Sequence, residues 1–345
     1  MNTKSIGWDI RALFSSSVAS LFLLAGMAAN AQTTYTYATS SGSWNTTTQW
    51  TPAGPPDGIG NTIASLNPNG GRTITLVGSH TFGNIACVIN NNRSYTFTPG
   101  SDSSSALTLQ VSSGTPSVSV AAGSSAGMLY LNAPLVGAQG FNKSGVGFFI
   151  LGAANTITGN INITGTGTGA NSGGWLVVNG SLPLNAPVMI NNYGGLAGYG
   201  MILDALTLNS GGKIDPGAAV YNSFQVGTLT AGALTWNGGG SLTYELAAAG
   251  ASDSMTLNGA LTKGTAGTFN FSFTQLAGFD TTQTYTLMTF SSASGFNASD
   301  FGGAPTGMEF CLTSTSLLLT PIPEPATWAI LLGGLGVVAA VRRRR

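Results

Sequence analysis

Charged side chains are scarce in this sequence. They make up 6% of its 345 residues, against about 25% in typical soluble proteins. Disordered chains combine few hydrophobic residues with high net charge, whereas 43% of these residues are hydrophobic. The pattern also argues against several membrane spans, because the apolar residues between the two ends are scattered among Thr, Asn and Gly. An exported, β-rich protein with many tight turns fits this composition.

The few charges are also unevenly placed. Residues 32–320 contain five basic and nine acidic side chains, which gives this body a net charge of −4. A body with this balance offers no basic platform for the phosphates of nucleic acids. We therefore predict no nucleic-acid partner.

Histidine and cysteine are almost absent. Histidine is a common ligand of metal sites and the general base of Ser-His-Asp catalysis. The only histidine here, His80, lies in a Gly-Ser-His-Thr stretch that is typical of a surface turn. Calcium-binding Gly-Gly-x-Gly-x-Asp repeats are lacking as well. Cys87 and Cys311 are far apart in sequence, and a disulfide and two free thiols stay open as alternatives. We predict no cofactor, no metal site and no catalytic residue.

Carboxylates are the remaining candidates for chemistry. The body contains Asp57, Asp102, Asp204, Asp215, Glu245, Asp253, Asp280, Asp300 and Glu309. Enzymes that cleave polysaccharides use paired carboxylates, and Asp204 and Asp215 are the pair that neighbouring coils of a solenoid would bring together. Asp215, however, precedes Pro-Gly, which is ordinary placement in a turn.

Glycine is abundant, with 50 residues in the chain. Strands of three to five residues recur about every ten residues between 72 and 320, with Gly or Asn between them. Short strands at this spacing suit a sandwich, a barrel or a β-helix. A solenoid turns a corner several times per coil, and these corners favour residues that tolerate positive φ. In-register stacking of like charges would repel, whereas Thr and Asn can stack as ladders. The sequence therefore predicts an all-β fold with a parallel β-helix or solenoid body.

The N-terminus has the order of a secretory signal peptide. Lys4 and Arg11 precede an apolar run at residues 18–27, and Ala29-Asn30-Ala31 follows as a small-x-small cleavage site. The run is short for a membrane span. We predict that residues 1–31 form a signal helix that directs export by the Sec machinery and is cleaved after Ala31.

Three tryptophans are candidate glycan contacts. Trp44 and Trp50 lie among Thr, Ser and Asn at the start of the body, and Trp175 lies in its middle. Exposed indole rings can stack on sugars, which is why these residues are candidates. For Trp44 and Trp50 the favoured interpretation is that they cap the open end of a β core.

The middle of the body is repetitive. Asn155-Thr156-Ile157-Thr158-Gly159 is followed by Trp175-Leu176-Val177-Val178-Asn179-Gly180-Ser181-Leu182, and later by Ile214-Asp215-Pro216-Gly217. These units resemble the autotransporter-associated β-strand repeat over about residues 145–250. The resemblance implies right-handed parallel β-helix coils and no catalysis. We therefore expect an N-terminal β region and cap at 32–144, solenoid repeats at 145–250 and a C-terminal β cap at 251–320.

The last residues combine three features in order. Pro323-Glu324-Pro325 has an extended backbone because of its prolines, residues 326–341 form a short apolar segment, and Arg342, Arg343, Arg344 and Arg345 end the chain. Sixteen residues make a short membrane helix, which arginine snorkelling and bilayer thinning accommodate. The arginines place that end in the cytoplasm, and the signal peptide places the body on the other side.

This tail, residues 321–345, resembles the PEP-CTERM sorting signal. The resemblance implies recognition by an exosortase, a membrane transpeptidase, with cleavage near Pro323-Glu324-Pro325. It also implies a bacterium that makes extracellular polysaccharide. The leading hypothesis is a non-enzymatic structural protein of the cell surface or extracellular matrix, tethered first to the inner membrane with its body in the periplasm. A carbohydrate-active enzyme on a β-helix and a glycan-binding adhesin are the alternatives.

Overall fold

The computed structural model describes residues 32–323, except 38–39, 67–70, 90–92, 102–103, 122–126, 167–172, 221–222 and 249. The predicted signal peptide with its cleavage after Ala31 lies outside the described residues. The same holds for Glu324, Pro325, the predicted membrane helix at 326–341 and the arginine cluster at 342–345. Among the described residues, no helix has the length and apolar character that crossing a membrane requires.

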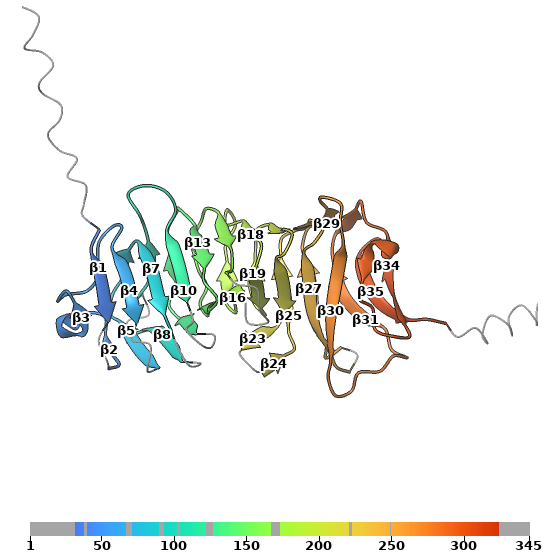
Figure 1. The fold of residues 1–345 in the computed structure, drawn as a ribbon, viewed down its shortest axis with the longest axis horizontal. Helices are drawn as coiled ribbons and strands as arrows, with labels where there is room; N and C mark the ends of the chain where they lie inside the picture. Colours follow the sequence, from blue (N-terminus) through green and yellow to red (C-terminus); the bar gives the residue numbers. More distant parts are fainter. Residues whose placement is uncertain are drawn as a thin grey trace, which may run out of the picture. The chain divides into compact units, whose positions relative to one another are not determined.

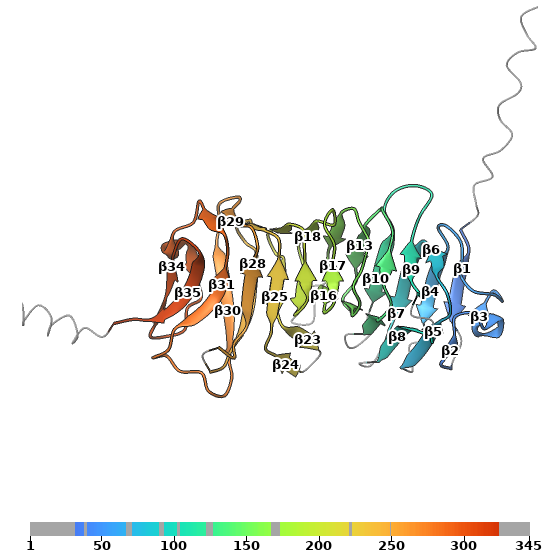
Figure 2. The ribbon, with the colours of Figure 1, turned by 180° about the vertical axis from the view of Figure 1, so that it is seen from behind.

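The body is all-β, and its strands form long parallel sheets (Figures 1 and 2). Sheet A has the order β3 (Trp50–Thr51), β1 (Thr34–Tyr37), β4 (Thr62–Leu66), β7 (Asn84–Val88), β10 (Ser117–Ala121), β13 (Phe141–Ser144), β15 (Ile161–Ile163), β18 (Val188–Ile190), β21 (Leu206–Leu208), β26 (Leu234–Trp236), β29 (Ala260–Lys263) and β32 (Ser292–Ser294). Sheet B has the order β2 (Gly42–Ser43), β5 (Arg72–Leu76), β8 (Ser94–Pro99), β11 (Met128–Leu131), β14 (Phe148–Leu151), β16 (Gly174–Val178), β19 (Gly194–Gly198), β22 (Lys213–Pro216), β27 (Ser241–Leu246), β30 (Phe269–Gln275) and β33 (Phe301–Gly302).

A third face is divided between two sheets. Sheet C has the order β12 (Leu135–Val136), β9 (Leu107–Leu109) and β6 (His80–Phe82). Sheet D has the order β17 (Ser181–Leu182), β20 (Met201–Ile202), β25 (Thr228–Ala231), β28 (Ser254–Leu257), β31 (Tyr285–Thr289), β35 (Ser316–Pro321) and β34 (Met308–Leu312). A hairpin of β23 (Ala218–Val220) and β24 (Ser223–Gln225) projects between β22 and β25.

The chain visits the three faces in a fixed order. From β4 onward it passes from sheet A to sheet B and then to sheet C or D, and each strand pairs with its counterpart one coil away. The exception is the coil of β13 and β14, where the isolated bridge between Ala154 and Ser181 replaces a strand on the third face. Antiparallel pairs occur in the β23–β24 hairpin and at the two ends, where β3 pairs with β1 and β35 pairs with β31 and β34. Two 3-10 helices, η1 (Thr47–Gln49) and η2 (Ala298–Asp300), are the helical segments of the described residues. The predicted parallel β-helix-like body is therefore confirmed.

Alternation along each strand builds the core. In-register residues of sheet B form an inward column of large apolar side chains: Tyr95, Leu129, Phe149, Leu176, Leu196, Ile214, Leu242 and Phe271. Every member is buried. Burial of such side chains contributes about 1.5–3 kcal/mol each to stability. The stacked coils are therefore stabilised by this continuous apolar column rather than by ion pairs on the surface.

The repeat motif has a clear structural role. Asn155 is buried, and its Oδ1 accepts a hydrogen bond from the amide of Leu135 in the preceding coil at 2.9 Å. Its Nδ2 donates to the carbonyl of Ser181 in the next coil at 2.9 Å. Gly159 then turns the chain with φ of +95°, and a Cβ there would overlap the backbone of Gly140. The asparagine thus joins three coils, and the glycine lets two of them approach.

The two cysteines are not joined. Cys87 is buried in β7 and Cys311 lies in β34, and both are free thiols. Many coils separate these strands in sheets A and D. Of the two alternatives that the sequence left open, the structure has the free thiols.

Candidate functional site

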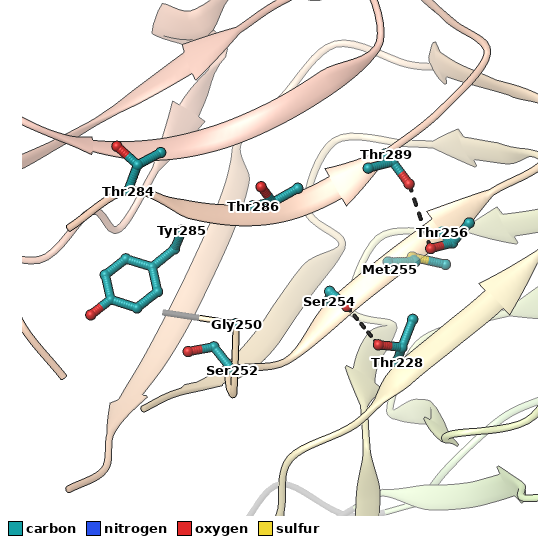
Figure 3. A pocket seen from close by; sticks show the side chains of 10 residues that line it. All are labelled: Thr228, Gly250, Ser252, Ser254, Met255, Thr256, Thr284, Tyr285, Thr286 and Thr289. Atoms are coloured by element: carbon teal, nitrogen blue, oxygen red, sulfur yellow. Dashed lines mark hydrogen bonds between the residues drawn. The ribbon is translucent and has the colours of Figure 1, made fainter. Parts of the chain in front are cut away.

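A shallow groove on the outer face of sheet D is one candidate site (Figure 3). Its volume is about 250 Å³, at the small end of the range of about 300–1,000 Å³ that is typical of small-molecule pockets. It is lined by Thr228, Gly250, Ser252, Ser254, Met255, Thr256, Thr284, Tyr285, Thr286 and Thr289. The lining is uncharged and rich in hydroxyl groups, so it offers hydrogen bonds without selecting for a charged ligand.

The register of sheet D places these hydroxyls in rows. Thr228 of β25 lies opposite Ser254 of β28, and their hydroxyl oxygens are 2.7 Å apart. Thr256 of β28 lies opposite Thr289 of β31, whose Oγ1 donates to Oγ1 of Thr256 at 3.5 Å. Neighbouring strands are about 4.8 Å apart, so the sheet presents polar groups at a regular spacing along its stacking direction.

The aromatic ring in this groove is not free to stack on a sugar. Tyr285 is 2% exposed and packs against Phe279 with ring centroids 5.5 Å apart. Its hydroxyl accepts a hydrogen bond from the amide of Asp280 at 2.8 Å. The groove therefore presents threonine and serine rather than an aromatic platform.

A second candidate site is a cluster of three carboxylates. Asp215 of β22, Glu245 of β27 and Asp253 just before β28 each place one oxygen so that all three lie within 4.8 Å of one another. Burial, with a smaller contribution from Glu245, raises the pKa of Asp215 to about 8. Burial and hydrogen bonding to the Glu245 side chain raise the pKa of Asp253 to about 9. Asp215 and Asp253 therefore hold a proton more readily than an exposed carboxyl group does.

The sequence did not single out this cluster. It favoured Asp204 and Asp215 as the pair to be brought together, whereas the structure brings Asp215 to Glu245 and Asp253. Asp204 instead accepts a hydrogen bond from the adjacent amide of Ala205 at 2.7 Å. The signal that could have found the cluster is the register of β22 on β27, which a single sequence does not give.

The cluster is closed to a polysaccharide. In a glycosidase the two carboxyl groups flank the scissile bond, so a sugar must fit between them. Here Glu245 and Asp253 are only 4% and 1% exposed. None of the three lines the groove of sheet D. The site therefore lacks the access that polysaccharide cleavage needs.

His80 differs from its predicted place. It lies in β6 and is 6% exposed, so the prediction of a surface turn residue is wrong. Its Nδ1 is 3.1 Å from both carboxylate oxygens of Asp57, and its ring stacks on Trp44 at 4.9 Å. Its Nε2 is buried, with no hydrogen-bond partner in the described part of the chain. The pair therefore lacks a hydroxyl or thiol that it could activate.

Two of the three candidate glycan contacts are buried. Trp44 is 0% and Trp50 is 2% exposed, and their rings meet edge to face with centroids 5.2 Å apart. Trp50 Nε1 donates to the carbonyl of Trp44 at 2.8 Å. Both belong to the first coil, which agrees with the favoured interpretation of a capped end, and neither presents a ring to a sugar.

Trp175 is the half-buried member of the three. It lies on the outer face of sheet B and stacks on Phe148, with centroids 6.3 Å apart and an angle of 13° between the rings. A neighbouring coil has Gly195 in register with it. The ring therefore extends an outward apolar cluster that contains Phe148, Ile150, Val177 and Ala197.

Comparison with known proteins adds two similarities. Residues 321–345 match the family description "PEP-CTERM protein-sorting motif". The chain is also similar to the "Adhesin BmaC autotransporter" of Brucella suis biovar 1 (strain 1330), with 28% identity over an alignment of 239 residues that covers 62% of this chain. The chain spans about 6% of the length of that relative. The chain thus ends in a PEP-CTERM protein-sorting motif and has an autotransporter-like β body.

Proposed function

We propose that the protein is an exported structural component of the cell surface or extracellular matrix that contacts neutral polysaccharide. An exosortase recognises its tail near Pro323-Glu324-Pro325, while the segment at 326–341 and the arginines 342–345 hold it in the inner membrane with the body in the periplasm. The sorting-motif match supports export and sorting. The similarity to a protein named as an adhesin supports a surface role without chemistry.

The hydroxyl-lined groove of sheet D is the observation that supports the polysaccharide partner. Its lining is uncharged, and the body as a whole has a net charge of −4, which disfavours polyanions such as uronic-acid polymers. Each hydroxyl contact is weak, and a net hydrogen bond contributes about 0.5–1.5 kcal/mol. A polymer that engages several chains at once gains from multivalency. A shallow groove on a stiff solenoid therefore suits a repetitive polymer better than a single small ligand.

Sedimentation with an insoluble neutral polysaccharide tests this proposal. The probe is cellulose, with alginate as a charged comparison, and the test variant changes Thr228, Thr256 and Thr289 to valine. Valine keeps shape and strand preference but removes the hydroxyl. We expect the affinity for cellulose to fall about tenfold, equivalent to about 1.4 kcal/mol.

A matched control lies on another face of the same coils. Thr207, Thr235 and Thr262 are the half-buried, outward residues at the centres of β21, β26 and β29. Changing these three to valine should leave the cellulose affinity unchanged. Equal losses in both triple variants, or tighter binding of alginate than of cellulose, would contradict the proposed groove.

Trp175 offers a second, aromatic contact for the adhesin alternative. Its half-buried ring stands on sheet B rather than sheet D, so its contribution is separable. A sugar ring could pack its apolar face on the exposed part of the indole ring. If Trp175→Ala weakens cellulose binding and the valine triple does not, the aromatic face is the contact surface.

Sorting is tested separately from polysaccharide binding. Changing Pro323, Glu324 and Pro325 to alanine should leave the tail attached, so that mass spectrometry of the membrane fraction finds the arginine cluster at 342–345. The parent protein should lose it in a host with an active exosortase. Identical processing of the two proteins would mean that the tail is a plain anchor.

A further inference from the structure

A hollow at the C-terminal end of the coil stack lies apart from the groove of sheet D. It is formed by η2, β33 and β34, and its volume is about 430 Å³. Sheet B ends at β33 and sheet D ends at β34, so within the described ranges no further coil covers this end (Figure 1). Most of its lining is apolar, and we call it the end hollow. The apolar lining residues are Ala298, Phe301, Ala304, Met308 and Phe310.

The end hollow combines an aromatic floor with little charge. Phe310 is half-buried, and its ring centroid lies 5.8 Å from that of Phe301. Asp300 beside the hollow is neutralised by Lys263 Nζ at 2.7 Å. Glu309, which also lines the hollow, is exposed and belongs to neither ion pair of the described residues. An apolar floor with one acid suits the zwitterionic surface of a bilayer, whereas an anionic ligand would be repelled.

The chain leaves the body at the rim of this hollow. Met308 of the lining lies in register with Pro321, the last residue of β35. The amide of Ile322 then donates to the carbonyl of Gly307 at 2.9 Å. Because the sorting-motif match begins at residue 321, the motif starts inside the last strand and not after a linker. The tail is therefore fixed to the hollow as far as Ile322.

The length of the remaining chain brings the hollow to the membrane. This inference rests on the proposed function, in which residues 326–341 anchor the protein. An extended chain from Ile322 to residue 326 reaches at most about 14 Å. A helix of sixteen residues is about 24 Å long, against about 30 Å for the hydrocarbon core, and such a mismatch draws the flanking residues toward the bilayer. The end hollow is therefore held close to the headgroups.

We propose that the end hollow is a membrane-docking surface that packs on the zwitterionic lipid surface around the anchor. Weak affinity suffices, because the tether keeps the hollow at a high effective concentration next to the lipid. The contact holds Pro323-Glu324-Pro325 at the membrane surface, where an exosortase works. Cutting the tail removes the tether, so the same weak contact then lets the body leave.

Quenching by nitroxide-labelled lipids tests the contact. Phosphatidylcholine vesicles carry residues 32–345, the chain that the predicted signal cleavage leaves, with Cys311 changed to serine and a fluorescent label on Ser299→Cys. Ser299 of η2 is exposed and lines the end hollow. The matched control is a label on Thr48→Cys, which is exposed on η1 in the first coil. Cys87 is buried and stays unlabelled. We expect headgroup nitroxides to quench most of the fluorescence at position 299 and none at position 48.

A flexible linker separates the affinity of the hollow from the pull of the tether. Twenty Gly and Ser residues inserted between Ile322 and Pro323 span about 25 Å on average, which lets the body leave the lipid. Quenching at Ser299→Cys should persist if the hollow itself packs on lipid. Adding Ala304→Glu to the linker variant should abolish it, because a charge then enters the apolar lining. Ser314→Glu adds the same charge to an exposed turn outside the lining and should leave the quenching intact.

The outcomes distinguish this contact from the proposed anchor. Loss of quenching with the linker alone would overturn the docking surface, since the tether alone would then hold the body near the lipid. Equal effects of Ala304→Glu and Ser314→Glu would overturn it as well. A dimer by light scattering, with the label at 299 shielded from the nitroxides, would assign the hollow to a second copy. A protein without the linker that floats with the vesicles but is not quenched refutes the docking surface alone, whereas one that does not float refutes the anchor and the contact together.

Discussion

Asn209 donates a hydrogen bond from Nδ2 to Oδ1 of Asn191 at 2.8 Å, across two successive coils. Asn237 in the following coil donates to Oδ1 of Asn209 in the same way, also at 2.8 Å. Each asparagine directly follows its strand of sheet A, namely β18, β21 and β26. The three side chains form a ladder along one corner of the solenoid, and this ladder joins coils without using charge.

Removing the middle rung should destabilise the protein. Asn209→Ala loses a hydrogen bond on each side, and at about 0.5–1.5 kcal/mol for each bond the free energy of unfolding should fall by about 1–3 kcal/mol. Urea unfolding measures the loss. Asn160→Ala is the control, because Asn160 is exposed and its change should cost under about 0.5 kcal/mol. Equal effects of the two changes would mean that the ladder contributes nothing.

A buried lysine should make stability depend on pH. Lys143 of β13 is 0% exposed and donates to the carbonyls of Ser144 and Gly147 at 2.7 and 2.9 Å. Burial lowers its pKa to about 7, against about 10.4 in an unfolded chain. The folded protein then binds fewer protons than the unfolded chain between these values. Its free energy of unfolding should therefore rise with pH across this window, by on the order of 1 kcal/mol per pH unit.

Comparison with Lys143→Met isolates this contribution. The neighbouring Cys87 stays neutral because burial raises its pKa to about 12. Asp215 and Asp253 act in the opposite direction, since their raised pKa values, about 8 and 9, make stability fall as pH rises through them. Both proteins share that fall. The free energy of unfolding of the parent minus that of Lys143→Met should therefore increase from pH 7 to pH 10. A constant difference would contradict a neutral lysine in the folded state.

Gly195 should not tolerate a side chain. It lies in register with Trp175 on the outer face of sheet B, and a Cβ there would overlap the indole ring. Gly195→Ala must therefore displace Trp175, and overpacking of this kind costs about 1–3 kcal/mol. Gly42→Ala is the control, because its Cβ would meet its nearest neighbour, Tyr37, at an ordinary 3.4 Å. Tryptophan fluorescence and urea unfolding report the two effects, and an unchanged spectrum for Gly195→Ala would contradict the packing.

The sequence predicted the parts of the fold that depend on local chemistry. Short alternating strands between Gly and Asn turns predicted the solenoid, and the scarcity of charge predicted polar ladders such as Asn191 to Asn209. It did not predict the carboxylate cluster, because Asp215 and Glu245 meet only through the register of β22 on β27. His80 was misplaced for a related reason, since its burial comes from stacking on Trp44, a residue 36 positions earlier. Which residues of successive coils meet depends on the number of residues in each coil, and no single sequence motif gives that number.

Trp50 closes the first coil, and its removal should open that end. Its ring packs against Trp44 and against Tyr37 at 4.7 Å, and its Nε1 donates to the carbonyl of Trp44. Trp50→Ala should lower the free energy of unfolding by about 3–5 kcal/mol. It should also expose strand edges that associate between chains.

Light scattering together with urea unfolding tests this cap. The matched control is Trp175→Ala, which removes an equally large ring from the side of the solenoid. We expect concentration-dependent association for Trp50→Ala and a monodisperse protein for Trp175→Ala, because an open end offers unpaired backbone groups and a side face does not. If both variants associate equally, exposed apolar surface rather than the end of the coil stack is the cause.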